Sequence, residues 1–178
     1  RDYGEKSIGK EKRVWQQPGG IPVLWGLDKI DLSEPFIICE GEMDYLSFIQ
    51  AGIKQVVSVP FGVDNFGWVE ENWKWLEKAK AIYICMDNDN AGKKAEDKMK
   101  STFGIERVKK IELGSYKDVN ELLIAEGEAE VNNLYYTATD YNVEGIYNIA
   151  DIEVDEEERA YTSLKEIDRV IGGFREGE

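Results

Sequence analysis

The chain has 178 residues and carries 36 acidic against 22 basic side chains, which gives a net charge of −14 at neutral pH. That charge is unusual for a protein that binds nucleic acid, but much of it lies in one acidic stretch, residues 126–159, so it does not exclude such a role. With no histidine and only two cysteines, the sequence argues against a structural zinc site and a histidine-based catalytic site, and acid–base chemistry would fall to carboxylates, lysine, tyrosine or water.

The N-terminal third of the chain predicts short strands and one helix. Residues 21–26 predict an edge strand, since Pro22 has no N–H to donate within a sheet. The apolar run at 36–39 predicts a strand buried on both faces, and a further strand is expected at 56–59. Residues 42–51 predict a helix between them. Most of its apolar side chains are expected on one face: Met43, Leu46, Phe48 and Ile49.

The middle of the chain continues this alternation. Residues 65–80 predict an amphipathic helix rich in tryptophan, and the apolar run at 81–86 predicts another buried strand. A charged surface helix is expected at 91–103, a fourth strand at 107–113 and a helix at 119–125. Strands that alternate with helices are typical of a parallel sheet. The predicted fold class is therefore α/β, with a central, mostly parallel four-stranded sheet flanked by helices.

The C-terminal part predicts less regular structure. Helices are expected at 128–138 and 162–170, and the acidic residues 140–160 are typical of a solvated linker. The apolar runs of the chain are too short, and too often interrupted by charge, to cross a membrane. Because the chain begins at Arg1 rather than methionine and stops abruptly at Glu178, we interpret it as a fragment of a longer protein.

Acidic residues follow two of the predicted buried strands directly. Glu40 comes after residues 36–39, and Asp87 and Asp89 come after residues 81–86. Because ligands of open α/β sheets bind beyond the carboxyl ends of the strands, the three carboxylates are expected at one edge of the sheet. They would repel one another and raise each other's pKa unless a cation joins them. Oxygen-only ligands favour a hard ion such as Mg²⁺ or Mn²⁺.

Neighbouring charged residues have both a plain and a functional interpretation. Glu42 and Asp44 stand in the first turn of a predicted helix, where acids interact favourably with the helix dipole. Asp118 could simply cap the helix at 119–125, or it could add a carboxylate at the same edge of the sheet. Lys93 belongs either to an exposed helix face or to a site that contacts a triphosphate.

Three motifs in order along the chain are more specific than any one of them alone. They are Glu-Gly-Glu-Met-Asp at residues 40–44, Asp-Asn-Asp-Asn-Ala-Gly-Lys-Lys-Ala at 87–95, and Lys-Asp-Val-Asn-Glu-Leu-Leu at 117–123. Together they resemble a TOPRIM domain, the module shared by primases, type IA and type II topoisomerases and some nucleases, over about residues 35–125. The third motif is similar to the primase branch, in which a Lys-Asp-x-Asn segment closes the site.

The segments on either side of these motifs make the resemblance more specific. Residues 19–26 are similar to the end of the N-terminal polymerase subdomain of primases, and residues 163–178 are similar to the start of a ring-helicase domain. The parent protein therefore resembles phage-type or Twinkle-like primase–helicases. The resemblance implies four parts: the end of the N-terminal primase subdomain (1–33), the TOPRIM domain (34–126), a helical extension with an acidic linker (127–160), and a linker helix with the start of a truncated helicase domain (161–178).

The resemblance implies synthesis of RNA primers on single-stranded DNA by metal-dependent nucleotidyl transfer. The residues implied to be catalytic are also implied to be ligands of Mg²⁺ or Mn²⁺: Glu40, Asp87 and Asp89. Asp118 is implied to be a further metal ligand or a neighbour of one. Lys93 and Lys117 are implied to contact the triphosphate of the incoming nucleotide.

The resemblance also implies partners and a location. The partners would be the DNA template, NTPs, the protein's own helicase domain and a homo-hexameric ring, in the cytoplasm of a bacterium or from a phage gene, with no membrane involved. We expect little activity from the fragment alone, because the residues that bind the template and part of the NTP pocket would lie in the N-terminal subdomain.

Two other functions fit the same residues. A TOPRIM nuclease of the overcoming-lysogenization-defect type could use the same metal site, since a fold and its site do not fix the substrate. The Lys-Asp-x-Asn segment and the helicase-like tail favour a primase over this nuclease. A non-catalytic docking module of a replicative helicase would need no metal and would tolerate replacement of Asp87 and Asp89 by asparagine.

Overall fold

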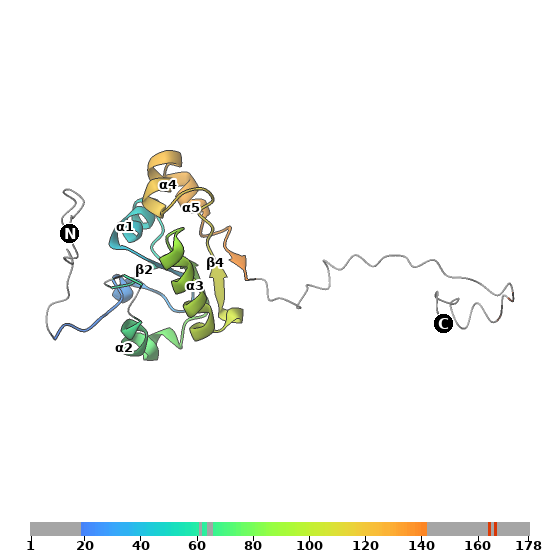
Figure 1. The fold of residues 1–178 in the computed structure, drawn as a ribbon, viewed down its shortest axis with the longest axis horizontal. Coiled ribbons are helices and arrows are strands. Elements are labelled where there is room, and N and C mark those ends of the chain that lie inside the picture. Colours follow the sequence, from blue (N-terminus) through green and yellow to red (C-terminus); the bar gives the residue numbers. More distant parts are fainter. Residues whose placement is uncertain (1–18, 61, 64–65, 142–163, 165, 167–178) are drawn as a thin grey trace. The chain divides into compact units, whose positions relative to one another are not determined.

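The computed structural model describes residues 19–60, 62–63, 66–141, 164 and 166 (Figure 1). The chain divides into two compact units, residues 1–141 and 142–178. Most of the helix predicted at 162–170 and most of the linker predicted at 140–160 lie outside the described residues. Among the helices of the described part, none is both long enough and apolar enough to cross a membrane.

A five-stranded sheet forms the centre of the first unit. Its strands are β1 (Phe36–Cys39), β2 (Val56–Ser58), β3 (Ile82–Cys85), β4 (Val108–Lys110) and β5 (Thr139–Asp140). The spatial order is β2-β1-β3-β4-β5; the first four are parallel, and β5 runs antiparallel to β4. The predicted α/β fold with a mostly parallel sheet is confirmed. The fifth strand was not predicted, because its two residues are polar and exposed and leave no apolar pattern.

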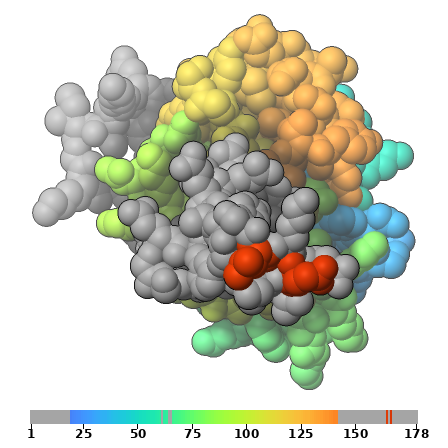
Figure 2. All heavy atoms as spheres, turned by 90° about the vertical axis from the view of Figure 1, so that its right-hand side faces the viewer, coloured from blue at the N-terminus to red at the C-terminus, as the bar shows by residue number. Residues whose placement is uncertain are grey.

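Helices connect the strands and cover the sheet (Figure 1). They are α1 (Glu42–Gln50), α2 (Gly67–Leu76), α3 (Asn90–Phe103), α4 (Val119–Glu126) and α5 (Glu128–Asn133), with 3₁₀ turns at η1 (Leu27–Lys29) and η2 (Ile105–Arg107). Several elements are shorter than predicted, and three of them clearly so: α2 occupies part of residues 65–80, β4 occupies part of residues 107–113, and α5 occupies part of residues 128–138. Figure 2 shows the surface of the unit on which α4 (yellow) and α5 (orange) adjoin.

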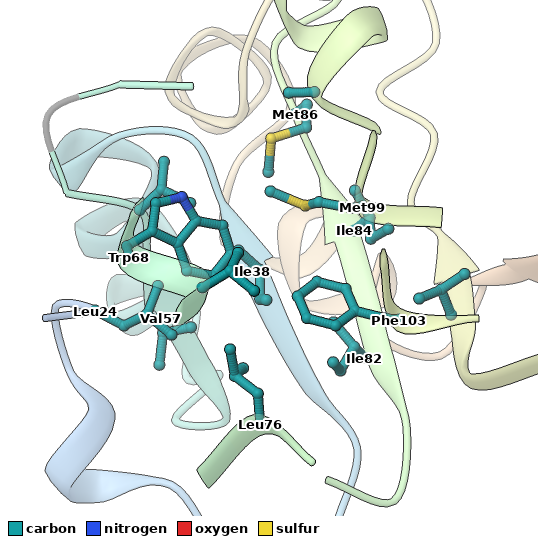
Figure 3. Packing of buried hydrophobic residues seen from close by; sticks show 14 of the residues in the cluster. Leu24, Ile38, Val57, Trp68, Leu76, Ile82, Ile84, Met86, Met99 and Phe103 are labelled. Carbon is teal, nitrogen blue, oxygen red and sulfur yellow. The ribbon is translucent and has the colours of Figure 1, made fainter. Parts of the chain in front are cut away.

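Alternate residues of the buried strands face two separate cores. Phe36 and Ile38 of β1 pack toward α2 and α3, in a cluster that includes Trp68 and Phe103 (Figure 3). Ile37 and Cys39 belong to the opposite cluster, which holds the buried side chains of α1, α4 and α5. Because every residue of β1 is buried, the strand carries no polar side chain until it ends. The first polar residue after it therefore lies at the carboxyl edge of the sheet.

The buried face of α1 matches the predicted one only at Phe48. Met43, Leu46 and Ile49 are 40%, 51% and 37% exposed, whereas Tyr45 and Phe48 are buried in the core. Burial of two aromatic rings removes more apolar surface from water than burial of the aliphatic side chains would. The helix is therefore turned so that the face with Tyr45 and Phe48 meets the sheet. The same rotation buries a carboxylate of α1 beneath the carboxyl edge of the sheet.

Both outer strands of the parallel part have a partner. On the β2 side, the predicted strand at 21–26 reduces to a single antiparallel bridge between Trp25 and Ser58, with N–H···O distances of 3.0 and 3.1 Å. On the β4 side, β5 pairs with β4, and Lys109 Nζ lies 3.2 Å from Asp140 Oδ1. Each outer strand of the four-stranded parallel part therefore has backbone partners along at least part of its length.

Candidate functional site

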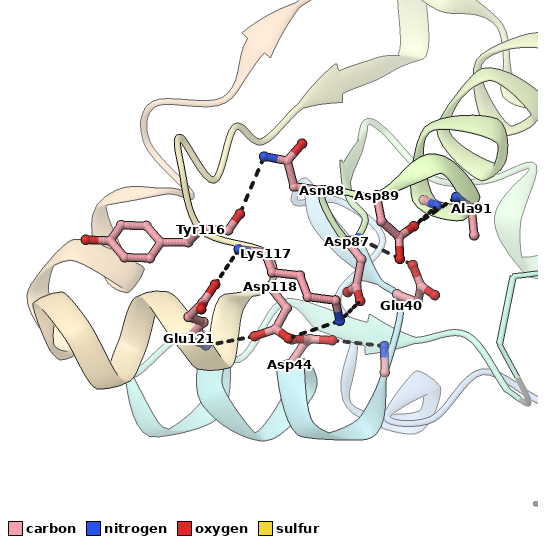
Figure 4. A network of polar contacts seen from close by, with 12 residues as sticks. Glu40, Asp44, Asp87, Asn88, Asp89, Ala91, Tyr116, Lys117, Asp118 and Glu121 are labelled. Carbon is pink, nitrogen blue, oxygen red and sulfur yellow. Dashed lines mark hydrogen bonds and ion pairs between the residues drawn. The ribbon is translucent and has the colours of Figure 1, made fainter. Parts of the chain in front are cut away.

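Two acidic residues meet where β1 and β3 end. The two strands are neighbours in register, with Cys39 opposite Cys85. Glu40 follows β1, and Asp87 comes two residues after the end of β3. Glu40 Oε2 accepts a hydrogen bond from the backbone N–H of Asp87 at 3.3 Å, so the two strand ends are joined (Figure 4). The sequence prediction that these carboxylates share one edge of the sheet agrees with this arrangement.

Burial and neighbouring acids both act on Glu40. They raise its pKa from 4.5 to about 7, with burial as the largest cause and the charge of Asp87 next. The hydrogen bond from the Asp87 N–H opposes this shift. Asp89 and Asp44 contribute further repulsion. At neutral pH, burial and these charges together therefore oppose the charged form of Glu40.

Asp44 is a member of the site that the sequence reasoning did not place there. Its side chain is buried, at 7% exposure, and Oδ2 accepts a hydrogen bond from the Gly41 N–H at 3.2 Å. Burial, followed by the charges of Asp87 and Asp118, raises its pKa to about 6. The position of Asp44 four residues before Phe48, on the buried face of α1, was the signal that could have identified it.

Asp89 and Asp118 each cap a helix with one carboxylate oxygen. Asp89 Oδ1 accepts hydrogen bonds from the N–H groups of Ala91 and Gly92 at 2.8 and 2.9 Å, at the start of α3. These bonds lower the pKa of Asp89. Asp118 Oδ1 accepts one from the Glu121 N–H at 2.8 Å, at the start of α4. The capping role predicted for Asp118 is confirmed, and in both residues Oδ2 makes none of these capping bonds.

Lys117 lies between two of the acids rather than apart from them. Its Nζ is 3.1 Å from Asp87 Oδ2 and 3.7 Å from Asp118 Oδ2 (Figure 4). The hydrogen bond and the charge of Asp87 raise the pKa of Lys117. In this arrangement the ammonium compensates carboxylates, whereas the sequence prediction assigned it to a triphosphate.

Lys93 lies in a different environment. It is exposed on α3 and lines a pocket of about 400 Å³ together with Asp87, Asn88 and Lys110. The pocket adjoins the acidic edge through Asp87. The Lys93 side chain therefore shares one pocket with a carboxylate of the acidic edge.

Asn88 fixes the loop that carries Lys117 and Asp118. Its backbone N–H donates to the Lys117 carbonyl at 2.7 Å, and its side-chain Nδ2 donates to the Gly114 carbonyl at 3.1 Å. A longer contact of 3.5 Å reaches the Tyr116 carbonyl. These bonds join the turn after β3 to the turn before α4. Asn88 is thus a positioning residue, and this role could be recognised only from the conformation of the loop.

Gly92 allows α3 to approach this turn. A Cβ atom at Gly92 would lie 2.0 Å from the Asp87 carbonyl oxygen and 3.0 Å from its nitrogen and carbonyl carbon. Backbone atoms cannot give way as a flexible side chain can. Only glycine therefore permits the first turn of α3 to pack against Asp87 with Asp89 as its cap.

The donor set suits a hard divalent cation, although it is not preassembled. Glu40, Asp44, Asp87 and Asp118 all offer carboxylate oxygens, the ligands that Mg²⁺ and Mn²⁺ prefer. Within the residues that the structure describes, no three His, Cys, Asp or Glu side chains are already arranged to hold an ion. The mutual repulsion at Glu40 and Asp44 is what a bound cation would relieve.

Comparison with known proteins gives matches over much of this chain. A family model described as Toprim-like matches residues 37–123. The Twinkle homolog protein, chloroplastic/mitochondrial, of Arabidopsis thaliana is 30% identical over 167 residues, which cover 81% of this chain and 24% of that protein. The primase homolog protein of the same plant is 31% identical over 137 residues, which cover 65% and 41%. The chain thus spans less than half the length of either relative.

Solved structures share the fold. A chain of a bacteriophage T7 complex, in which the lagging-strand DNA polymerase interacts with primase domains, has a TM-score of 0.55 and 22% identity, covering 61% of this chain and 56% of that one. The Aquifex aeolicus primase has a TM-score of 0.54 and 23% identity, covering 78% and 34%. The RNA polymerase domain of the Mycobacterium tuberculosis primase has a TM-score of 0.56 and 16% identity, covering 74% and 43%. At such identities, these likenesses establish the fold.

Proposed function

We propose, from the match of residues 37–123 to a Toprim-like family model and from the fold shared with primase structures, that the chain is the TOPRIM part of a DNA primase. The parent protein would be a primase–helicase that synthesises RNA primers on single-stranded DNA during replication. The relatives named Twinkle homolog and primase homolog support this assignment. The observation that carries it is the convergence of Glu40, Asp44, Asp87 and Asp118 on one edge of the sheet.

In the proposed reaction, a 3′-hydroxyl attacks the α-phosphate of an incoming NTP and pyrophosphate leaves. A divalent metal ion, when bound to the carboxylates, would activate the attacking oxygen and neutralise phosphate charge. Asp87, Asp118 and Asp44 would hold this ion, and Asp89 could add the oxygen that does not cap α3. Glu40 uses Oε2 for the Asp87 N–H, which leaves Oε1 to accept the proton of the attacking hydroxyl or to complete the ligand set.

Basic side chains would orient the triphosphate. Lys93, on the pocket that adjoins Asp87, is placed to meet a phosphate beyond the metal-binding edge. The template, the remaining part of the NTP pocket and the helicase ring would be supplied by parts of the parent protein outside residues 34–126.

Primer synthesis by the longest natural protein that contains this chain tests the proposal. The assay contains single-stranded DNA, NTPs and Mg²⁺, and reads out short RNA products. Asp87→Asn is expected to lower the rate by about 100-fold or more, while Lys94→Ala, an exposed change on α3, leaves it unaltered. Primer synthesis at the wild-type rate by Asp87→Asn would overturn the assignment. Metal-dependent DNA cleavage without primer synthesis would replace it with the nuclease function.

A further inference from the structure

Lys117 occupies the position in which a bound cation would be needed. Its ammonium is within 4 Å of two of the four converging carboxylates, Asp87 at 3.1 Å and Asp118 at 3.7 Å. The Asp87 side chain is 16% exposed, whereas the Lys117 side chain is 59% exposed. The charged end of Lys117 thus enters the acidic edge from outside, on a long side chain that remains open to solvent.

We infer that Lys117 acts as an exchangeable cation, which neutralises the metal-free site and must leave Asp87 and Asp118 before a divalent ion binds them. The inference rests on the proposed function, because it concerns the metal that the site would use. A divalent ion and an ammonium at the same carboxylates would repel each other strongly at such short distances. Binding of the ion therefore requires that Lys117 move out toward solvent.

The loop that carries Lys117 does not depend on its ammonium. The Lys117 carbonyl accepts a bond from the Asn88 N–H at 2.7 Å, and the Lys117 N–H donates to Glu121 Oε2 at 2.6 Å. Asp118 is fixed separately by its capping bond to the Glu121 N–H. With the backbone held on both sides, the side chain can swing away while Asp118 stays in place.

The exchange has a consequence for the order of binding. In the metal-free site the ammonium is engaged by carboxylates and is withheld from phosphate. Once a divalent ion has displaced it, the ammonium remains near the edge on its lysine stem, where it can meet the phosphates of an NTP. The site would therefore take up the metal ion before it gains its full affinity for a triphosphate.

Binding of Mn²⁺ to the 178-residue chain, followed by the EPR signal of the free ion, tests the inference. Lys117→Met removes the ammonium and keeps the apolar stem, and is expected to lower the Mn²⁺ dissociation constant about 3- to 10-fold. Lys94→Met removes the same charge from an exposed lysine near the start of α3 and is the matched control. Its dissociation constant is expected to stay within about 2-fold of wild type, because only the general attraction for cations changes.

A second measurement follows Lys117 itself. The side-chain ammonium signal of Lys117 in ¹⁵N NMR is expected to change from that of an ion-paired lysine to that of a solvated one during a Mg²⁺ titration. Equal or weaker Mn²⁺ binding by Lys117→Met would overturn the exchange, and would assign Lys117 a structural or ligand-supporting role while the metal site stands. Absence of binding by wild type and by Lys117→Met would overturn both the exchange and the metal site. If Asp87→Asn abolishes Mn²⁺ binding, that result supports the metal site independently of Lys117.

Discussion

The backbone N–H of Asn88 donates a 2.7 Å hydrogen bond to the carbonyl oxygen of Lys117, across 29 positions of the chain. This bond joins the turn after β3, which carries Asp87 and Asp89, to the turn before α4, which carries Asp118. The side chain of Asn88 adds a second bond, to the Gly114 carbonyl. The geometry of the acidic edge therefore depends on an uncharged residue between two acids.

The variant Asn88→Ala is expected to loosen the turn before α4 without unfolding the domain. It keeps the backbone bond and loses the side-chain bonds, so the stability loss should be about 1 kcal/mol. Mn²⁺ affinity should fall about 3- to 10-fold, because the turn that leads to Asp118 is then joined to residue 88 by the backbone bond alone. Calorimetric metal titration and amide exchange of residues 114–118 measure the two effects. Asn90→Ala, at the exposed start of α3, is the control, and an equal loss of affinity in both variants would contradict the positioning role.

The variant Gly92→Ala is expected to destabilise the protein, although alanine normally stabilises a helix relative to glycine by about 1 kcal/mol. The new Cβ would lie 2.0 Å from the Asp87 carbonyl oxygen, so either α3 or the Asp87 turn must move. We expect a loss of about 1 to 3 kcal/mol in urea denaturation together with weakened metal binding. Lys94→Ala, two positions along the same helix, should leave both quantities nearly unchanged. A stabilised Gly92→Ala protein would show that the turn adapts at no cost.

The stability of the metal-free chain should depend on the protonation of Glu40. Its pKa is raised from 4.5 to about 7, so the folded state binds this proton more tightly than the unfolded state. The free energy of unfolding therefore falls as pH rises through that window and levels off above it. Because Glu40 is only half-buried, solvent screening reduces the contribution to about 1 kcal/mol.

The variant Glu40→Gln isolates this effect. In EDTA, it should be more stable than wild type at about pH 8 and should lose that advantage at about pH 5. Urea denaturation at the two pH values measures the difference. Equal differences at both values would mean that the pKa of Glu40 is not raised in the folded protein.

Arg107 should stabilise the opposite edge of the sheet. Its Nη2 donates to the carbonyls of Leu76, Glu77 and Ala79 at 3.0, 3.3 and 2.9 Å, which satisfies the end of α2. The variant Arg107→Met should cost about 1.5 to 3 kcal/mol, and Arg107→Lys should recover part of this by retaining the charge near the helix C-terminus. Metal affinity should not change, since Arg107 precedes β4 and lies away from the carboxyl edge. A coupled loss of Mn²⁺ binding would indicate that the two edges are not independent.

Much of this site could be predicted because it follows from strand direction. Apolar runs located β1 and β3, and parallel pairing then brought Glu40 and Asp87 to one edge. Asp44 was missed because its helix turns Tyr45 and Phe48, not Met43 and Leu46, toward the sheet, and a helix of nine residues admits either face by pattern alone.

The role of Lys117 was beyond prediction for a different reason. Its ion pairs join residues from two turns, whose conformations depend on tertiary hydrogen bonds from Asn88 rather than on local sequence. The role of Gly92 also could not be predicted, since nothing in the sequence pattern of α3 shows that the Asp87 backbone lies against it.

The partners of the two outer strands bear on where the domain can be cut. Unpaired outer strands recruit strands from other molecules, and Trp25 on β2 and β5 on β4 occupy those positions here. Both partners fall outside the predicted TOPRIM boundaries of 34 and 126. A protein trimmed to those boundaries would keep every acidic residue of the site and expose two rows of backbone hydrogen-bonding groups. Such a fragment should aggregate under conditions in which a fragment of residues 19–141 stays monomeric. The boundaries of the smallest stable domain are therefore set by the partners of the outer strands and not by the sequence motifs.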